Sequence, residues 1–513
     1  MQRRTFLGLG LAGLLPAGLP ATAAAPDWVE GTLARLDLDG RIAQLMMPML
    51  EDQAEAEALV KRFRVGGFVC FKGRSDEFAR RLAGLQTLST LPLLMAADFE
   101  RGAGAYVDGA TELPTAMAIG AADDPDLAYA AGRVTAREAR ALGVHAVFAP
   151  VLDLNNNPKN PIINVRSFGE DPARVALLGG AFARGLEEHG TLATIKHFPG
   201  HGNVATDSHR DLGAVGGDRR TLEALELAPF RRVMATHPPR GLMAAHLWVR
   251  AFDPAPVPAT LSPRVLSDLL RREMGYRGLV FTDSLGMGGV LNHVRDWPEA
   301  QVLALAAGCD VLVMPTGIAT DGSRSHLLGV ERGIAAIRQA VRRGRLSAAR
   351  IEASTRRVLA AKAWLGLPGS TASDPATLNS AEHRAVAQRI ARSALTLVQD
   401  RRGLLPLTPG KRLGIVRLTN REGDGAFGRD SDAFVSYFRS VDTVQWSAAL
   451  PSAELGAALE LAARVDVLLV AASLKVFVGD GSGDLSAEHR AALARLSAAN
   501  PNLVFLSFGS PYA

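Results

Sequence analysis

The segment KHFPGHGNVATDSH, residues 196–209, is dense in side chains that bind or carry protons. His197 and His201 stand four positions apart, a spacing that a helix can use to hold zinc, but a proline and a glycine lie between them. Because proline breaks the interior of a helix, these two imidazoles cannot form a helical zinc site. A metal site built from loop geometry is the weaker alternative, since the chain shows no other obvious ligand cluster, and we expect no bound metal.

The same segment ends in Asp207 and His209, two positions apart. On an extended loop such residues point to the same side, so the carboxylate could hold one imidazole nitrogen and leave the other free to transfer a proton. Asp283, in VFTDSLGM, supplies a second carboxylate. A carboxylate that attacks a sugar and a second group that protonates the leaving oxygen are the parts of a retaining glycosidase. The triplet D-S-H is weak alone, since a surface loop could carry it.

These residues need a scaffold, and the chain after Arg41 alternates short apolar runs with stretches of helical period. Runs that are apolar throughout predict parallel strands covered on both faces. Acidic residues and a proline near the start predict helices over 123–142 and 172–189. Eight such units predict a (β/α)₈ TIM-like barrel. The runs are 42–50, 65–71, 92–98, 145–154, 191–198, 241–249, 278–284 and 309–315.

Polar side chains stand at or near the ends of five of these runs. The active site of a parallel barrel forms where the carboxyl ends of its strands meet. Hydrogen bonding at strand ends would explain one or two such residues, but not a set on five strands. We therefore expect a functional site at this rim. The residues are Asp98, Asp153, Lys196 with His197, His246 and Asp283.

A second domain follows the predicted barrel domain, residues 26–367. The connector 368–380 is rich in proline, glycine and serine, and residues 381–513 predict a smaller α/β sandwich domain with a parallel-type sheet. The last apolar run ends five residues before the chain does, so we expect this sheet to be truncated at the C-terminus. The expected strands are ALTLVQD, RLGIVRL, VDVLLVAAS and NLVFLSF, and the expected helices are near 381–394, 452–463 and 486–499.

Residues 1–25 resemble an export signal. Arg3 and Arg4 precede an apolar stretch from Phe6 to about Leu19 and a run of small residues that ends at Ala25, which is the pattern of a cleaved twin-arginine signal. A membrane anchor is the weaker alternative, because about 14 apolar residues cannot span roughly 30 Å of hydrocarbon. We expect an exported protein, periplasmic or secreted.

Composition narrows the class of protein. Hydrophobic residues make up 48% and charged residues 21%, a balance that favours a globular chain over a disordered one. The net charge of +5 is spread over 57 basic and 52 acidic residues, so no nucleic-acid partner is expected. Cys70 and Cys309 lie in apolar runs and are predicted to be buried free thiols.

Several motifs resemble those of glycoside hydrolase family 3. The run K-H-F-P-G-H-G followed by D-S-H is similar to the β-N-acetylhexosaminidase branch of that family. The resemblance covers the whole mature chain: the barrel, the connector and a second domain whose opening is also similar to the family. Its motifs are IKHFPGHGNVATDSHRDL, INVRSFGEDP, APVLDLNNNP, GLMAAHLWV, GLVFTDSLGMGGV and ALTLVQDRRGLLPL.

The resemblance implies a role for each site residue. It implies Asp283 as the nucleophile, His209 as the acid/base and Asp207 as the partner of His209. It also implies that four polar side chains hold the hydroxyl groups of a terminal sugar, for which charged donors and acceptors are suited. These four are Asp98, Arg166, Lys196 and His197.

Other interpretations stay open at individual positions. Arg166 could brace its own loop, and Lys196 could pair with Asp153, which we place behind the sugar-binding residues. His201 could be structural, and His246 could touch the sugar or pack beneath it. The family often has a Glu-Gly-Gly-Arg run after the aspartate of the third strand, whereas this chain has DFERGAGAYVDGA, which leaves the contacts of that loop undetermined.

Together these features predict a cofactor-free, retaining, exo-acting β-N-acetylhexosaminidase. The expected substrates carry terminal β-linked N-acetylglucosamine, in peptidoglycan fragments or chito-oligosaccharides. A family 3 β-glucosidase or xylosidase would differ in the sugar. A phosphorylase would use the same residues, because a histidine acid/base, unlike a carboxylate, does not repel a phosphate acceptor. A non-catalytic cell-wall binding module is the alternative from another class.

Overall fold

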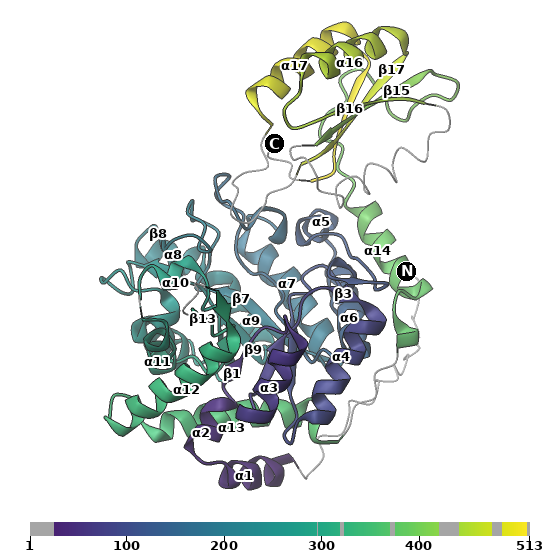
Figure 1. Ribbon diagram of the computed structural model, residues 1–513. Helices are drawn as coiled ribbons and strands as arrows, with labels where there is room; N and C mark the ends of the chain where they lie inside the picture. Colours follow the sequence, from purple (N-terminus) through teal and green to yellow (C-terminus); the bar gives the residue numbers. More distant parts are fainter. Residues whose placement is uncertain are drawn as a thin grey trace, which may run out of the picture.

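The computed structural model describes residues 25–294, 296–318, 323–369, 375–419, 441–474 and 485–509. Two parts are visible in Figure 1, a large barrel below and a smaller α/β unit above it. The predicted export signal lies outside the described residues except for Ala25, which begins helix α1 (Ala25–Arg35). The connector 368–380 is described only in part.

The predicted barrel is confirmed. A run of six parallel strands has the order β11-β9-β7-β6-β4-β2, and β1 pairs with β12. Single parallel bridges, Met49 to Val69 and Phe281 to Val311, join these two sets into a closed ring. Each strand lies inside one of the predicted apolar runs. The strands are β1 (Met46–Met47), β2 (Gly67–Val69), β4 (Leu94–Ala97), β6 (Ala146–Val147), β7 (Leu192–Phe198), β9 (Gly241–Ala244), β11 (Leu279–Thr282) and β12 (Leu312–Val313).

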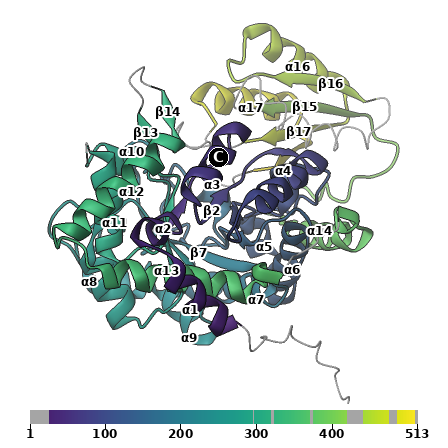
Figure 2. The same cartoon turned by 60° about the horizontal axis from the view of Figure 1, so that its bottom comes forward.

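Helices cover the outside of this ring (Figures 1 and 2). Two of the predicted helix starts are capped by aspartate, because Asp124 accepts from the amides of residues 126 and 127, and Asp171 accepts from the amide of Arg174. The barrel helices are α1, α2 (Leu38–Ala43), α3 (Gln53–Phe63), α4 (Ser75–Leu88), α5 (Ala116–Ala122), α6 (Pro125–Ala141), α7 (Pro172–Glu187), α8 (Arg219–Ala224), α9 (Leu227–Thr236), η4 (Arg264–Glu273), α10 (Gly288–Leu291), α11 (Trp297–Ala307), α12 (His326–Arg342) and α13 (Ala348–Trp364).

Short elements lie in the loops between barrel strands and helices. They are the strands β3 (Gly73–Arg74), β5 (Val107–Asp108), β8 (Gly213–Val215), β10 (Leu247–Val249), β13 (Gly317–Ile318) and β14 (Arg324–Ser325), and the turns η1 (Ala103–Ala105), η2 (Asn164–Arg166), η3 (Ala259–Leu261), η5 (Leu367–Gly369) and η6 (Pro375–Thr377). Among them, η2 and the loop between β7 and β8 carry residues of the predicted site.

Apolar side chains fill the interior of the barrel. Phe148, just after β6, and Phe281, in β11, are almost fully buried, and their ring centroids are 5.4 Å apart in an edge-to-face contact. Strands β6 and β11 are not neighbours in the ring, so this contact crosses the interior. Cys70 and Cys309 are buried and free, as predicted. Because the interior is packed, the polar groups gather at the rim.

The second domain is a parallel four-stranded sheet of order β16-β15-β17-β18. Its apolar core includes Trp446, Leu461 and Leu496, which come from the sheet and from two helices. The strands are β15 (Leu413–Thr419), β16 (Asp442–Trp446), β17 (Val467–Ser473) and β18 (Leu503–Ser507), and the helices are α14 (Ala381–Ser393), α16 (Ser452–Arg464) and α17 (Ala487–Ala499). The predicted α/β class of this domain is confirmed.

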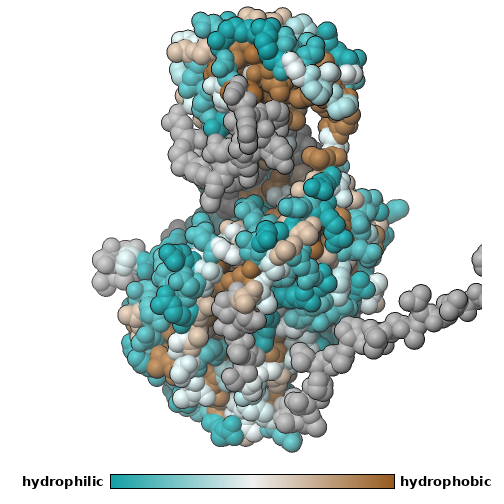
Figure 3. Space-filling model, turned by 90° about the vertical axis from the view of Figure 1, so that its right-hand side faces the viewer, coloured by the Kyte–Doolittle hydropathy of each residue, from teal (hydrophilic) through white to brown (hydrophobic). Residues whose placement is uncertain are grey.

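One predicted strand is wrong and one was missed. Residues 394–400, ALTLVQD, form no strand, and Leu395 and Val398 are 82% and 89% exposed. The missed strand is β16. Apolar and β-branched residues favour a strand only where a neighbouring strand takes up their backbone hydrogen bonds, and ALTLV has no such neighbour among the described residues. Figure 3 shows apolar side chains along the chain that joins the two parts.

Helix α14 fastens the second domain to the barrel, beside α5 and α6 (Figure 1). The Nδ1 atom of His383 lies 2.8 Å from the buried carboxylate of Glu138, and Glu382 pairs with Arg133 at 2.9 Å. Glu138 also accepts a hydrogen bond from the hydroxyl of Thr111 at 2.7 Å, so the helix and the loop after β4 share one carboxylate. No helix in the described ranges is long and apolar enough to cross a bilayer.

Candidate active site

The predicted rim is present in the structure. Asp98 directly follows β4, Lys196 and His197 lie near the end of β7, and Asp283 directly follows β11. His246 comes two residues after β9. Since these strands run parallel in one ring, their carboxyl ends bring residues from distant parts of the sequence to one face.

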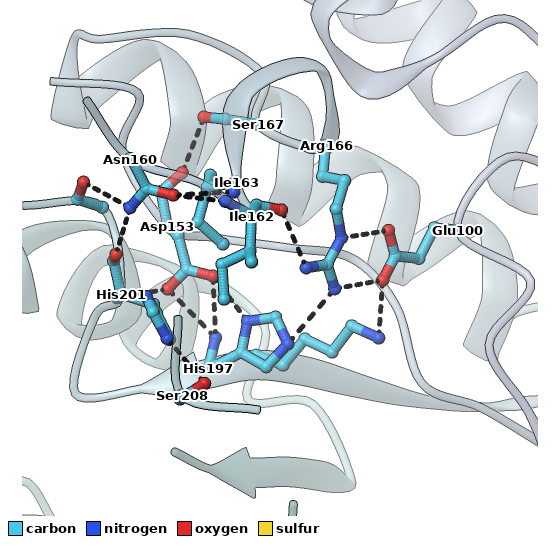
Figure 4. Close-up of polar contacts among 12 residues, drawn as sticks. Glu100, Asp153, Asn160, Ile162, Ile163, Arg166, Ser167, His197, His201 and Ser208 are labelled. Carbon is cyan, nitrogen blue, oxygen red and sulfur yellow. Dashed lines mark hydrogen bonds and ion pairs between the residues drawn. The ribbon is translucent and has the colours of Figure 1, made fainter. Parts of the chain in front are cut away.

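Two cations and two carboxylates form a network on this face, and Figure 4 shows its pairing of Arg166 with Glu100. The guanidinium of Arg166 donates to both oxygens of Glu100, at 2.9 and 2.7 Å. The ammonium of Lys196, only 2% exposed, lies 2.7 Å from Asp98 and 2.7 Å from Glu100. The alternative pairing of Lys196 with Asp153 is therefore wrong. Arg166 also donates to the carbonyl of Ile162 at 3.1 Å, so it braces its loop while it reaches into the site.

These charges keep one another ionised. Burial alone would raise the pKa of Glu100, but Arg166 and Lys196 lower it well below its usual range. Burial would lower the pKa of Lys196, but Asp98 and Glu100 raise it. A site with fixed opposite charges is suited to strong, directional hydrogen bonds with the neighbouring hydroxyl groups of a sugar.

His197 is oriented by Asp153. The Nδ1 atom of His197 lies 2.6 Å from Asp153 Oδ2, and Asp153 is buried. The Nε2 atom lies 3.3 Å from a guanidinium nitrogen of Arg166. Because an arginine only donates, Nε2 accepts and Nδ1 carries the proton whenever the ring is neutral. The expectation that Asp153 acts from behind the sugar-binding residues fits this geometry.

The contact predicted between Asp207 and His209 is present. The Nδ1 atom of His209 lies 2.8 Å from Asp207 Oδ1, and Nε2 has no hydrogen-bond partner among the residues that the structure describes. The His209 side chain is 41% exposed and that of Asp207 only 6%. A buried carboxylate that holds an exposed imidazole in one tautomer is the arrangement that proton transfer at Nε2 requires.

Asp283 is partly exposed at the end of β11 and accepts the amide of Ser284 at 2.8 Å. Burial would raise its pKa, but His197, His246 and His209 lower the pKa to about 2. An ionised carboxylate near these imidazoles is a competent nucleophile. The Nε2 atom of His246 donates to the carbonyl of Ser284 at 2.9 Å, and its Nδ1 atom lies 2.8 Å from Thr260 Oγ1, so both of its nitrogens are engaged within the protein.

The lowered pKa of Asp283 predicts how the activity depends on pH. In the folded protein this group is ionised above about pH 2, whereas an ordinary aspartate has a pKa of about 3.9. We expect kcat/KM for a glycoside with an activated leaving group to show no acid limb between about pH 3.5 and 5. Circular dichroism at each pH would verify folding. A half-maximal rate near pH 4 with the fold intact would contradict the lowered pKa of Asp283.

The side chains of His197 and His201 do not share a partner. The rings of His197 and His201 are 6.2 Å apart and nearly perpendicular, and each binds a different partner, Asp153 and Ser208. Within the part of the chain that the structure describes, no three histidine, cysteine or acidic side chains lie together as metal ligands would.

Glu100 is the main site residue that the sequence analysis missed. It stands two positions after Asp98, and in an extended segment such residues face the same side, which is the signal that could have identified it. Its partners Arg166 and Lys196 are 66 and 96 positions further along the chain, so the pairing itself depends on barrel closure.

Comparisons with known proteins identify the family. The family description "Glycosyl hydrolase family 3 N terminal domain" matches residues 37–361. The chain is 33% identical over 395 residues to beta-hexosaminidase A of Pseudoalteromonas piscicida, covering 72% of this chain and 64% of that protein. It is 31% identical over 427 residues to a beta-N-acetylglucosaminidase/beta-glucosidase of Cellulomonas fimi, covering 79% and 72%. The match thus spans less than two thirds of the first relative's length.

Solved structures with the same fold extend the similarity to both domains. A glycoside hydrolase family 3 beta-N-acetylglucosaminidase from Paenibacillus sp. str. FPU-7 has a TM-score of 0.79 and 31% identity, covering 92% of this chain and 90% of that one. A beta-glucoside phosphorylase has a TM-score of 0.83 and 25% identity, covering 96% and 89%. From its barrel, its rim of charged residues and these matches, we conclude that the chain belongs to glycosyl hydrolase family 3.

Proposed function

We propose that this protein is a retaining, exo-acting β-N-acetylglucosaminidase. The observation that carries the proposal is the pair of Asp207 and His209, 2.8 Å apart on the loop after β7, on the same face as the carboxylate of Asp283. The similarity to proteins named beta-hexosaminidase and beta-N-acetylglucosaminidase supports the choice of sugar.

The proposed reaction has two steps. Asp283 attacks the anomeric carbon while the Nε2 proton of His209 passes to the leaving oxygen, which forms a glycosyl-enzyme and releases the aglycone. The imidazole of His209, now neutral, then takes a proton from water through Nε2. That water attacks the same carbon, which breaks the bond to Asp283. Asp207 holds Nδ1 throughout and stabilises the imidazolium.

Four side chains would hold the terminal sugar. Asp98, 24% exposed, and Arg166, also 24% exposed, keep part of their polar surface open to the site. Lys196 and His197 are more deeply buried and are within reach of a sugar at the rim. The proposed substrates are peptidoglycan fragments and chito-oligosaccharides with a terminal β-linked N-acetylglucosamine.

A phosphorylase is the second candidate, favoured by the similarity to a beta-glucoside phosphorylase and by the histidine acid/base. An imidazole at this position does not repel an anionic acceptor, whereas a carboxylate would. Phosphate in place of water would then attack the glycosyl-enzyme and release a sugar 1-phosphate.

Product analysis separates these candidates. Chito-oligosaccharides, muropeptides and 4-nitrophenyl glycosides of N-acetylglucosamine and glucose would be incubated with phosphate or with sulfate at equal ionic strength. We expect free N-acetylglucosamine in both buffers, and a kcat/KM at least about tenfold higher than for the glucoside. Sugar 1-phosphate formed only in phosphate would establish the phosphorylase. Equal rates on both glycosides would contradict the proposed sugar specificity, and binding without turnover would contradict catalysis.

Export is also part of the proposal, because residues 1–25 carry the paired arginines, apolar stretch and small residues described above. A fusion of residues 1–30 to a reporter that is active only outside the cytoplasm tests it. We expect activity that is lost when Arg3 and Arg4 are replaced by lysine, since a twin-arginine signal depends on that pair.

A further inference from the structure

We propose that His201 is a positioning residue that holds the acid/base pair in place through the hydroxyl of Ser208. This inference rests on the proposed function, since it concerns the same proton transfer by His209. It gives a task to the second histidine of the K-H-F-P-G-H-G run, for which the sequence alone indicates a structural role.

The contact is short and buried (Figure 4). The Nε2 atom of His201 lies 2.9 Å from Ser208 Oγ, and both residues are 1% exposed. His201 is itself anchored, because its amide donates to Asp153 Oδ1 at 2.7 Å and its carbonyl accepts from the side chain of Asn160 at 2.8 Å. Asp153 also orients His197, so one buried carboxylate holds both the end of β7 and the start of the loop that follows it.

Ser208 lies between Asp207 and His209, so its position sets theirs. Its carbonyl accepts the amide of Gly289 at 3.0 Å, and the carbonyl of His209 accepts the amide of Gly288 at 2.9 Å. These glycines begin α10, the short helix that follows Asp283 after β11. Ser208, which joins Asp207 to His209, is therefore held by the side chain of His201 and by the backbone that follows Asp283.

The two glycines fit this docking closely. A Cβ atom at Gly288 would lie 2.2 Å from the carbonyl oxygen of Arg210, and one at Gly289 would lie 2.9 Å from that of Ser208. Residues 203, 205, 206, 209 and 210 of the same loop are exposed. Ser208 and Asp207 are thus the buried anchor of a loop whose neighbouring residues mostly face solvent.

His201 suits this role because it stays neutral. Burial lowers its pKa to about 4, and its Nδ1 atom is buried without a partner among the described residues. The ring therefore offers one hydrogen bond, to Ser208, and no added charge beside Asp207. It does not touch the reacting atoms in our proposal, and its effect on the rate passes through the placement of His209.

The test compares substrates that need protonation with one that does not. Ser208→Ala and His201→Phe remove the hydrogen bond, and the serine change does so with little loss of volume. On a phenyl N-acetylglucosaminide, whose leaving group requires a proton, we expect kcat/KM to fall about tenfold to 100-fold. On the 2,4-dinitrophenyl glycoside, which leaves unaided, the loss should be less than about threefold.

Ser354→Ala is the matched control, because it removes a buried hydroxyl that binds Asp310 at 2.6 Å, away from the rim. It should change both substrates alike. His209→Ala sets the full size of the leaving-group effect, and adding Ser208→Ala to it should cause no further loss. Additive losses would overturn the inference.

The two proposals fail in different ways. If His209→Ala itself shows no dependence on the leaving group, the proposed acid/base role is wrong. If His209→Ala shows that dependence while Ser208→Ala and His201→Phe, both folded by circular dichroism, reduce the two rates equally or not at all, only the positioning role is overturned.

Discussion

Asp283→Ala is expected to lower kcat/KM on a 4-nitrophenyl N-acetylglucosaminide by about 10⁴-fold or more, because loss of the nucleophile leaves only binding and electrostatic contributions. The carboxylate follows β11 directly, is ionised because its pKa is about 2, and lies near His209. The variant would be purified from cells that lack the wild-type gene. Its steady-state rates would then be compared with those of the wild-type protein.

Two controls accompany this variant. Asp268→Ala removes an exposed carboxylate that pairs with Arg272 on its own helix, and it should keep the full rate. A chelator should leave the wild-type rate unchanged.

A slow fluorinated N-acetylglucosaminide should add the mass of one sugar to the wild type at Asp283 and none to Asp283→Ala. Full activity in Asp283→Ala would refute the nucleophile assignment.

Glu100→Gln is expected to reduce both stability and activity. It leaves the guanidinium of Arg166 without its carboxylate and gives Lys196 one ionised partner instead of two. Removing one partner from a largely buried charge network costs about 3 kcal/mol of unfolding free energy. Because Arg166 and Lys196 then lose their fixed positions against the sugar, kcat/KM should fall about 100-fold.

The stability loss should depend on pH. The folded pKa of Glu100 is lowered, so its contribution is complete above its unfolded pKa of about 4.3 and is lost as pH falls toward the folded pKa. Denaturant unfolding should therefore show a gap between wild type and Glu100→Gln that is constant above about pH 5 and narrows below about pH 4.

Glu112→Gln is the matched control for Glu100. Its carboxylate lies on the same loop, is 54% exposed and pairs with Arg101 at 2.6 Å, and exposed pairs contribute about 0–1 kcal/mol. Equal effects of the two substitutions, or a gap that does not change with pH, would show that the buried network has no special role.

Much of this architecture could be predicted because it depends on local patterns. Eight apolar runs, each bounded by helical stretches, allow few arrangements other than a parallel barrel, and in such a barrel a residue such as Asp98 or Asp283 at the end of a strand must lie on one face. The contact between Asp207 and His209 could also be predicted from a local pattern, since side chains two positions apart on an extended chain point to the same side.

Elements that depend on distant partners could not be predicted in this way. The run ALTLVQD has strong β propensity and still forms no strand, because propensity does not supply a neighbouring strand. Conversely, β16 is short and has three exposed residues among its five, and it forms because β15 pairs with it along its whole length.

The sequence by itself determined the barrel, its polar rim and the pair of Asp207 and His209, because periodicity and close spacing act within a few residues. Only the tertiary structure decided that Lys196 pairs with Asp98 and Glu100 and not with Asp153, and that His201 reaches Ser208. Those choices depend on distances of a few ångströms between loops that follow different strands or fold back on themselves, and the closure of the ring and the packing of its loops set these distances.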